Sequence, residues 1–272
     1  MDQSDFLTHF LDIAGEELLK SPKQVSIEKV QSMLELTLRN PSSVSLSDKY
    51  KDDLVIEMSS MTLAEQILKI TSVVGADSTG KSDLRAMLDH KVDMSGLMSM
   101  GGLAGSNLPF SGIDALLLNF SVSFPISLIL NKKMMTKYQL LFRNLMQCKY
   151  AERLLSASWL DETRARLSIT RGRGSDQAFV QEECLFMSRL SSLRGKMQHF
   201  IQEFLYYVCF EVIEPNCERL LKRFDKRSTV DEVLKDHEDF LDSCLKESLL
   251  TTPKLFQVYI LFLFQKFRFS MV

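Results

Sequence analysis

The residues whose types and spacing point most directly to a chemistry lie in the segment VVGADSTGKS at 73–82. Gly75, Gly80, Lys81 and Ser82 match the pattern G-x-x-x-x-G-K-[ST]. In a loop of this kind, backbone N–H groups cradle nucleotide phosphates, the lysine reaches the terminal phosphates and the serine holds Mg²⁺. A working loop would make this chain a protein that binds ATP or GTP.

The surroundings of this loop favour another interpretation. A phosphate loop lies in a parallel sheet, between strands and helices that alternate along the chain. Here the flanking segments repeat apolar residues at the helical period over nearly the whole chain. A second carboxylate for Mg²⁺ should end an apolar strand, and the best candidate, Glu211, lies in a helical pattern. We therefore interpret the motif as a chance match in a flexible loop that binds no nucleotide, with a P-loop nucleotide-binding protein as the alternative.

Other catalytic arrangements are weaker. The carboxylate pairs Glu211/Glu214 and Asp239/Asp242 stand at helical spacing, which is more typical of a solvated helix face than of an acid/base pair. His237 lies on the apolar stripe of its helix and is expected to be a half-buried, hydrogen-bonded side chain. No two histidines have the spacing of metal ligands on a helix. We therefore expect no enzyme, no cofactor and no metal site.

The composition is that of an ordinary soluble globular protein. The chain has 272 residues, 45% of them apolar and 25% charged, and its net charge of −2 gives no general attraction for nucleic acid. Its five cysteines include no C-x-x-C pair and, with no secretory signal recognised, are expected to be free thiols in a reducing compartment. The most apolar stretch, at 255–264, is ten residues long, whereas a membrane span needs about 20. We expect a buried terminal helix there and no membrane span.

Glycine and proline are scarce, and apolar residues recur at helical spacing along most of the chain. In the segment that starts near 131, one apolar stripe is expected to face the core: Met134, Tyr138, Leu141, Phe142, Leu145 and Cys148. Ser26 is a candidate N-cap, and Thr229 followed by Glu232 fits a capping box. The predicted helices cover 3–20, 26–38, 61–74, 131–160, 178–213 and a segment that begins after Thr229.

The remaining segments complete the predicted fold. Residues 75–112 hold most of the glycines, with many serines and methionines, and are expected to form a flexible linker. The run at 115–130 is the only strand-like one, and Pro125 interrupts it. The predicted class is all-α, with elongated helical bundles, one long low-complexity linker and at most a short extended segment. The predicted parts are a helical region at 1–74, the linker at 75–112 and a helical bundle at 113–272.

Several motifs in one order carry a resemblance to a known family. The segment at 120–160 reads FSVSFPISLILNKKMMTKYQLLFRNLMQCKYAERLLSASWL, and the segments QEFLYYVCFEVIEPNCERL at 202–220 and TVDEVLKDHEDFLDSCLKESLLTTPKLFQV at 229–258 follow it. Together they resemble the C-terminal (GRIP) region of the γ-tubulin complex proteins and are most similar to the component 2 branch. The chain departs from the family pattern at Asn216–Cys217, where a tryptophan is frequent, and in its final residues, which look shortened or replaced.

The resemblance implies a function without chemistry on a substrate. It implies that the helical bundle at 113–272 binds γ-tubulin and positions it to nucleate microtubules. It also implies other complex components as partners, especially component 3, and a place in the cytoplasm, on the cytoskeleton at microtubule-organising centres or spindle poles. A generic helical scaffold with an unrelated partner is a further alternative.

A basic segment is the candidate contact surface for γ-tubulin. Residues 132–153 carry six basic side chains against one acidic side chain. Such a run is either a solvated helix face or a surface that steers an acidic tubulin partner and fixes its register. The predicted γ-tubulin-binding residues are Ser123, Ser127, Lys132, Lys133, Lys137, Arg143, Lys149 and Arg153.

Overall fold

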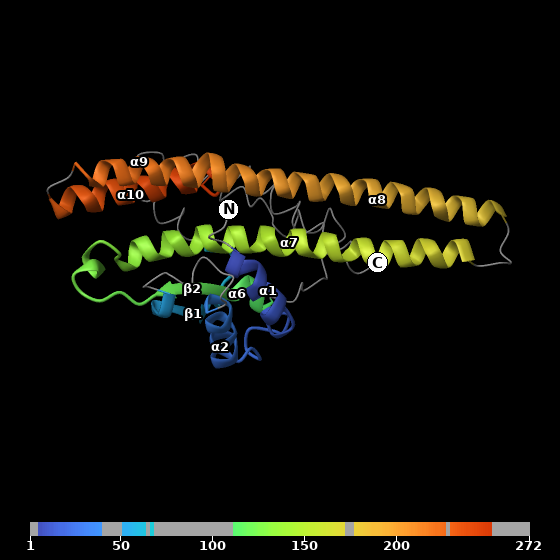
Figure 1. Ribbon diagram of the computed structural model, residues 1–272, viewed down its shortest axis with the longest axis horizontal. Coiled ribbons are helices and arrows are strands. Elements are labelled where there is room, and N and C mark those ends of the chain that lie inside the picture. Colours follow the sequence, from blue (N-terminus) through green and yellow to red (C-terminus); the bar gives the residue numbers. More distant parts are fainter. Residues whose placement is uncertain are drawn as a thin grey trace, which may run out of the picture. The chain divides into compact units, whose positions relative to one another are not determined.

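The computed structural model describes residues 5–39, 51–63, 66–67, 111–171, 177–226 and 229–251. They belong to two compact units, unit 1 at Met1–Ser123 and unit 2 at Phe124–Val272. Helices dominate the described residues, and one two-stranded sheet accompanies them (Figure 1), so the predicted all-α class is confirmed. The predicted linker, apart from residues 111–112, lies outside the described residues. So do the phosphate-loop motif and the apolar stretch at 255–264.

Two helices predicted from periodicity build one side of unit 1. Helix α1 spans Asp5–Leu18 and helix α2 spans Ile27–Leu38, close to the predicted 3–20 and 26–38. Their apolar stripes are buried. Ser26 occupies the N-cap of α2 with an extended backbone, but its side chain makes no capping hydrogen bond.

A carboxylate joins the two helices. The Oε2 atom of Glu17 on α1 accepts hydrogen bonds from Lys20, at 2.8 Å, and from Lys29 on α2, at 2.7 Å. The hydrogen bonds from Lys20 and Lys29 lower the pKa of Glu17 to about 2. Glu17 therefore stays ionised near neutral pH and holds the start of α2 against the end of α1.

Unit 1 contains a strand that periodicity did not predict. Strand β1, Leu54–Met58, follows the short 3₁₀-helix η3, Lys51–Asp53, and pairs antiparallel with β2, Leu116–Phe120. The Gln31 side chain of α2 bonds two backbone groups of β1: it donates to the Leu54 carbonyl at 3.0 Å and accepts from the Ile56 N–H at 2.8 Å. Of the strand-like run at 115–130, only residues 116–120 form a strand.

The short helix α6, Gly112–Ala115, leads into β2 and packs tightly against α1. Ser111 and Asp114 form a capping box at its start. The Gly112 N–H donates to the Lys20 carbonyl at 2.9 Å. A Cβ atom at Gly112 would lie 2.8 Å from the Leu18 carbonyl oxygen and 2.9 Å from Val25 Cγ2. Only glycine fits this approach without a shift of the neighbouring backbone.

Unit 2 is built around two long antiparallel helices. After the 3₁₀-helix η4, Ile126–Leu128, come α7 at Lys132–Arg171 and α8 at Gln177–Tyr206. They lie side by side; α10 at Val230–Glu247 packs against α7, and α9 at Glu214–Phe224 packs against α10 (Figure 1). Thr229 stands at the N-cap of α10, as predicted, without a side-chain capping hydrogen bond.

The predicted helix at 178–213 is continuous and extends beyond Pro215. A π-helix, Tyr207–Ile213, joins α8 to α9, and the Glu214 N–H donates to the Cys209 carbonyl five residues back. Proline has no N–H to donate and its ring crowds the carbonyl four residues earlier, so a wider turn accommodates it. Asn216 is buried, and its amide nitrogen donates to the Val212 carbonyl at 2.7 Å and to Glu247 of α10 at 2.9 Å. The polar residue at the family's frequent tryptophan position thus ties α9 to α10.

The stripe predicted for α7 describes only part of its buried surface. Met134, Leu141 and Cys148 are buried as expected. In contrast, Phe142 and Leu145 are half-buried, and Tyr138 is exposed. Buried positions off the stripe include Arg143, Asn144 and Met146. Because α7 contacts both α8 and α10, more than one of its faces is covered.

We predict opposite effects for two glycine-to-alanine substitutions in unit 1. Gly112→Ala should lower the free energy of unfolding by about 1–3 kcal/mol, because its methyl group meets backbone and a packed valine. Gly15→Ala is the matched control, since nothing lies within 4 Å of its Cβ position in α1. It should raise the stability by up to about 1 kcal/mol through helix propensity. Denaturant unfolding measures both, and equal effects would contradict the packing described for Gly112.

Candidate functional site

Two of the lysines predicted to bind a partner are engaged within the chain. Lys137 of α7 contacts Asp242 of α10 at 2.5 Å and Glu238 at 3.3 Å, and Lys133 also bonds Glu238. The hydrogen bond from Lys133 lowers the pKa of Glu238, and the same bond raises the pKa of Lys133. The four side chains thus form a charged clasp between α7 and α10, and the carboxylates offset the lysine charges.

An aromatic pair lies next to this clasp. Tyr138 Oη and His237 Nε2 share a hydrogen bond of 2.8 Å, with ring centroids 5.6 Å apart. Tyr138 is about one-third exposed, and desolvation of its covered part raises its pKa to about 12. Burial, followed by the charge of Lys137, lowers the pKa of His237. Both groups are therefore held neutral near pH 7. His237 is hydrogen-bonded, as predicted, but it is buried and not half-buried.

The other predicted binding residues of α7 do not share one surface. Arg143 is 1% exposed and does not present its charge on the surface of the described chain. Lys149 pairs with Glu152 at 3.2 Å. Lys132 and Arg153 are exposed. The six basic residues proposed from charge therefore divide into two lysines of the clasp, a buried arginine, a lysine paired within its own helix and two exposed positions.

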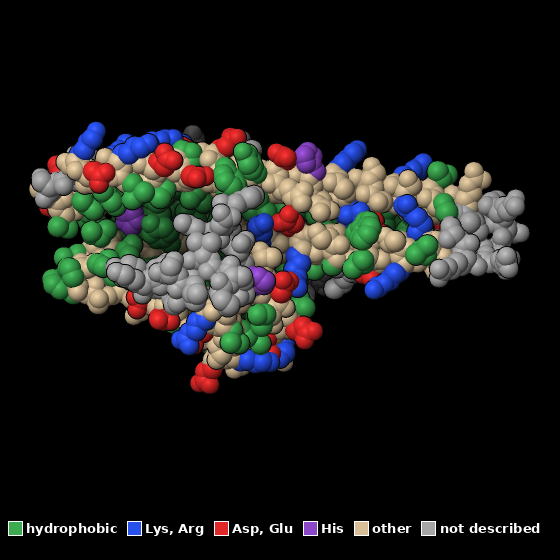
Figure 2. Space-filling view, in the orientation of Figure 1, with side chains coloured by type: hydrophobic (Ala, Val, Ile, Leu, Met, Phe, Trp, Pro, Cys, Tyr) green, Lys and Arg blue, Asp and Glu red, His purple; other side chains and the backbone are tan. Residues whose placement is uncertain are grey.

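The segment just before α7 presents apolar side chains to solvent. Phe124, Ile126 and Leu128 are 78%, 43% and 55% exposed. With Lys132 and Lys133 they make up a surface that we call the tip, residues 124–133. Figure 2 shows hydrophobic side chains gathered at the end of unit 2 where this loop lies in Figure 1. Ser127 lies half-buried within the tip, and Ser123, exposed, is the last residue of unit 1.

Sequence reasoning named the serines of this segment and missed its apolar side chains. Pro125 is the feature of the sequence that could have indicated them. It interrupts the strand-like run, so Phe124 and Ile126 are not expected to take part in a ladder of strand hydrogen bonds. Exposed apolar side chains in a cluster mark sites where a protein binds a partner. The tip is therefore a candidate surface for contact with another protein.

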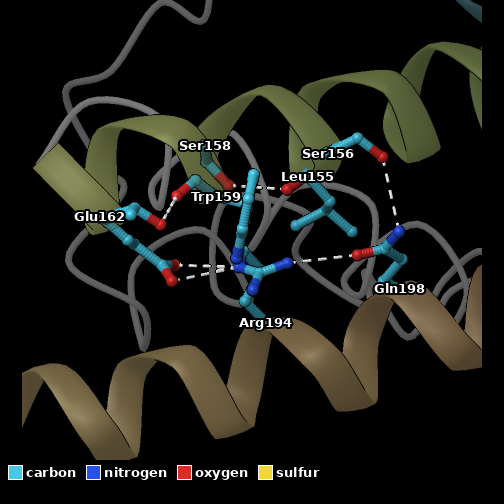
Figure 3. Close-up of polar contacts among 8 residues, drawn as sticks. Leu155, Ser156, Ser158, Trp159, Glu162, Arg194 and Gln198 are labelled. Carbon is cyan, nitrogen blue, oxygen red and sulfur yellow. Dashed lines mark hydrogen bonds and ion pairs between the residues drawn. The ribbon is translucent and has the colours of Figure 1, made fainter.

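A row of polar contacts holds α7 against α8. Arg194 Nε donates to both carboxylate oxygens of Glu162, each at 3.1 Å, and Arg194 Nη1 donates to Gln198 (Figure 3). Gln198 in turn donates to Ser156 at 3.4 Å. The Arg194 and Glu162 side chains are only about one-tenth exposed. The ion pair is therefore shielded from bulk water, and it fixes the register of the two helices.

The carboxylate pairs considered for catalysis do not form a site. Glu211, Glu214 and Asp239 are exposed, and Asp242 belongs to the clasp. Within the residues that the structure describes, no group of three His, Cys, Asp or Glu side chains could hold a metal ion. All five cysteines are free, as predicted. None of the described helices is both long and apolar enough to span a bilayer.

Comparisons with known proteins confirm the resemblance seen in the motifs. Residues 1–268 match the family model described as "Gamma tubulin complex component C-terminal". The chain is 32% identical over 259 residues to gamma-tubulin complex component 2 of Mus musculus, covering 95% of the chain and 25% of that protein. It is 33% identical over 273 residues to spindle pole body component alp4 of Schizosaccharomyces pombe, covering 95% of the chain and 34% of alp4. The chain thus spans about a quarter to a third of the length of these relatives.

Stability should fall in mild acid because of His237. Its pKa in the folded state lies below the ordinary value of 6.5, so between the two values the unfolded chain binds more protons and the free energy of unfolding falls as the pH falls. His237→Gln should flatten this part of the profile, measured by denaturant unfolding from pH 7 to pH 5. Tyr138→Phe keeps the aromatic ring next to His237 and should keep the slope. An unchanged slope in His237→Gln would show that other groups cause it.

The Glu162–Arg194 pair should show strong coupling. Arg194→Met alone should cost about 2–4 kcal/mol of unfolding free energy, because it leaves a largely buried carboxylate unpaired. Glu162→Leu combined with Arg194→Met should return to within about 1 kcal/mol of the native chain, because no charge is then left without a partner. Additive losses in this double-mutant cycle would mean that the two side chains do not interact as the structure shows.

Proposed function

Because this chain belongs to the gamma-tubulin complex component family, we propose that it binds γ-tubulin and positions it for microtubule nucleation. The names of its relatives, a component of the gamma-tubulin complex and a spindle pole body component, support this proposal. The proposed role is structural: the chain makes and breaks no bond and needs no cofactor of its own.

The proposed partners and location follow from the same relatives. They are γ-tubulin and other components of the complex, component 3 in particular, since a component 3 of Drosophila melanogaster is 33% identical over half of this chain. The proposed location is the cytoplasm, on the cytoskeleton at microtubule-organising centres and spindle poles. Neither nucleic acid nor a membrane is a proposed partner.

We place the γ-tubulin contact at the tip of unit 2, and the observation that carries this proposal is the exposure of Phe124, Ile126 and Leu128. Interfaces bury apolar anchors at their centre and surround them with polar or charged groups. Lys132 is exposed beside these side chains and would face acidic groups of a tubulin surface. In this arrangement the apolar residues provide affinity, and the lysine speeds association.

A rigid base would let the tip hold γ-tubulin in a fixed orientation. The tip continues directly into α7, whose first turns are joined to α10 by the clasp and by the Tyr138–His237 hydrogen bond. Positioning requires that a bound partner cannot rotate freely on its support. The contacts between α7 and α10 supply that stiffness next to the proposed contact.

Substitution of the tip tests this proposal. The triple variant Phe124→Ser, Ile126→Ser and Leu128→Ser should fold normally, because these side chains are exposed. It should bind purified γ-tubulin at least about tenfold more weakly, a loss of ~1.4 kcal/mol. The affinity is measured by titrating labelled γ-tubulin with the full chain.

Matched controls lie in the same unit. Leu221 on α9 and Val230 on α10 are each 57% exposed, and their replacement by serine should leave γ-tubulin affinity unchanged. Lys81→Ala, in the phosphate-loop motif, should also have no effect. If the tip variant binds like the native chain while its circular dichroism is unaltered, the contact lies elsewhere.

A further inference from the structure

Two of the free cysteines of unit 2 lie on helices that pack against each other. Cys217 is a half-buried residue of α9, and Cys244 is a fully buried residue of α10. The two helices lie side by side (Figure 1). A disulfide bond needs Cα atoms within about 7 Å of each other. The register of α9 against α10 therefore decides whether these two thiols could be joined.

Two side-chain contacts fix this register. Asn216, in the first turn of α9, donates to Glu247, at the end of α10, at 2.9 Å. Arg223, in the last turn of α9, donates to Asp236, in the first half of α10, at 3.5 Å. The start of one helix thus faces the end of the other, and the pair is antiparallel.

The antiparallel register places the two cysteines opposite one another. Counted residue by residue from the contact of Asn216, Cys217 stands opposite position 246. Counted in the same way from the contact of Arg223, it stands opposite position 242. Cys244 is the midpoint between these two positions.

The electrostatics of Tyr138 on α7 support the same placement. Desolvation is the largest cause of its raised pKa, and negative charge on Cys217 or Cys244 raises that pKa further. For Cys244, burial and then the charge of Glu247 raise the pKa to about 12, and charge on Cys217 adds to the increase. Each sulfur is therefore near enough to the Tyr138 hydroxyl, and to the other sulfur, for their charges to interact.

The two thiols differ in how readily an oxidant reaches them. The thiolate is the reactive form of a cysteine, and solvent access decides which thiol meets a dissolved oxidant first. Cys217 is half-buried, whereas Cys244 is fully buried and stays protonated near neutral pH. Cys217 is therefore the thiol that reacts first, and Cys244 is placed to react with the product.

We propose that hydrogen peroxide oxidises Cys217 and Cys244 to a reversible disulfide that joins α9 to α10. The Cys217 thiolate attacks one peroxide oxygen, the O–O bond breaks, and a sulfenic acid and water form once the hydroxide takes up a proton. The Cys244 sulfur then attacks the Cys217 sulfur, the S–O bond breaks, and the hydroxide leaves with the Cys244 proton as water. Two thiols are oxidised, and one peroxide is reduced to two waters.

The disulfide acts on a helix that supports the tip. Helix α10 carries Glu238 and Asp242 of the clasp with α7, and the new bond ties α10 covalently to α9. Closing the chain between the two cysteines restricts the unfolded state, so the oxidised chain is the more stable form. In a reducing compartment such a bond is transient and reports the presence of an oxidant. The proposal does not depend on γ-tubulin binding.

The test treats the full, reduced chain with hydrogen peroxide and maps its disulfides by mass spectrometry after digestion without a reductant. The expected product is a pair of peptides joined through Cys217 and Cys244, which dithiothreitol separates. The Tm should rise by about 5–10 °C on oxidation and return to its first value after reduction. Dimedone, which traps sulfenic acids, should label Cys217 before the disulfide appears.

Two variants complete the test. Cys184→Ser is the matched control, because Cys184 is half-buried like Cys217 but lies on α8, so this variant should form the same disulfide with the same rise in Tm. Cys244→Ser should stop at the Cys217 sulfenic acid and show no rise. The proposal is overturned if the native chain forms disulfides only between other cysteines. It is also overturned if Cys217 is oxidised while Cys244 remains a free thiol, or if neither reacts.

Discussion

The antiparallel pairing of α7 and α8 is the interaction on which unit 2 depends. The two helices contribute 40 and 30 residues, and neither buries its apolar surface without the other. Buried residues such as Ala151, Leu155 and Ile201 lie along them, and the Glu162–Arg194 pair fixes which turn of one faces which turn of the other. The tip precedes α7, so the proposed contact surface takes its position from this pair.

The sequence was sufficient to predict most helices because their apolar residues recur at a regular period. It also predicted that the helix from 178 to 213 is continuous, because this segment contains no proline and only one glycine, Gly195. Strand β1 was missed for a physical reason. Its partner β2 lies about sixty residues further on, and pairing over that separation depends on tertiary contacts, among them Gln31 on the free edge of β1. The five-residue segment LVIEM is too short for its side-chain pattern to predict such a pairing.

The candidate site could be located from sequence only as a region. Counting charges selected 132–153, yet the structure buries Arg143 and joins Lys133 and Lys137 to Glu238 and Asp242, which lie about a hundred residues away. Charge counting cannot separate a lysine that meets a partner from one that holds two helices together, because the acidic residues come from another part of the chain. Pro125 indicates that Phe124 and Ile126 leave the strand, but the exposure of Phe124, Ile126 and Leu128 depends on the path of the backbone.

The central claim is that the chain meets γ-tubulin at the tip. The most direct measurement is amide hydrogen exchange of the full chain alone and saturated with γ-tubulin. The account predicts slower exchange at 124–133 on binding, because these backbone groups pass from a solvent-exposed loop into an interface. Slower exchange confined to unit 1 or to α9, with 124–133 unchanged, would contradict it.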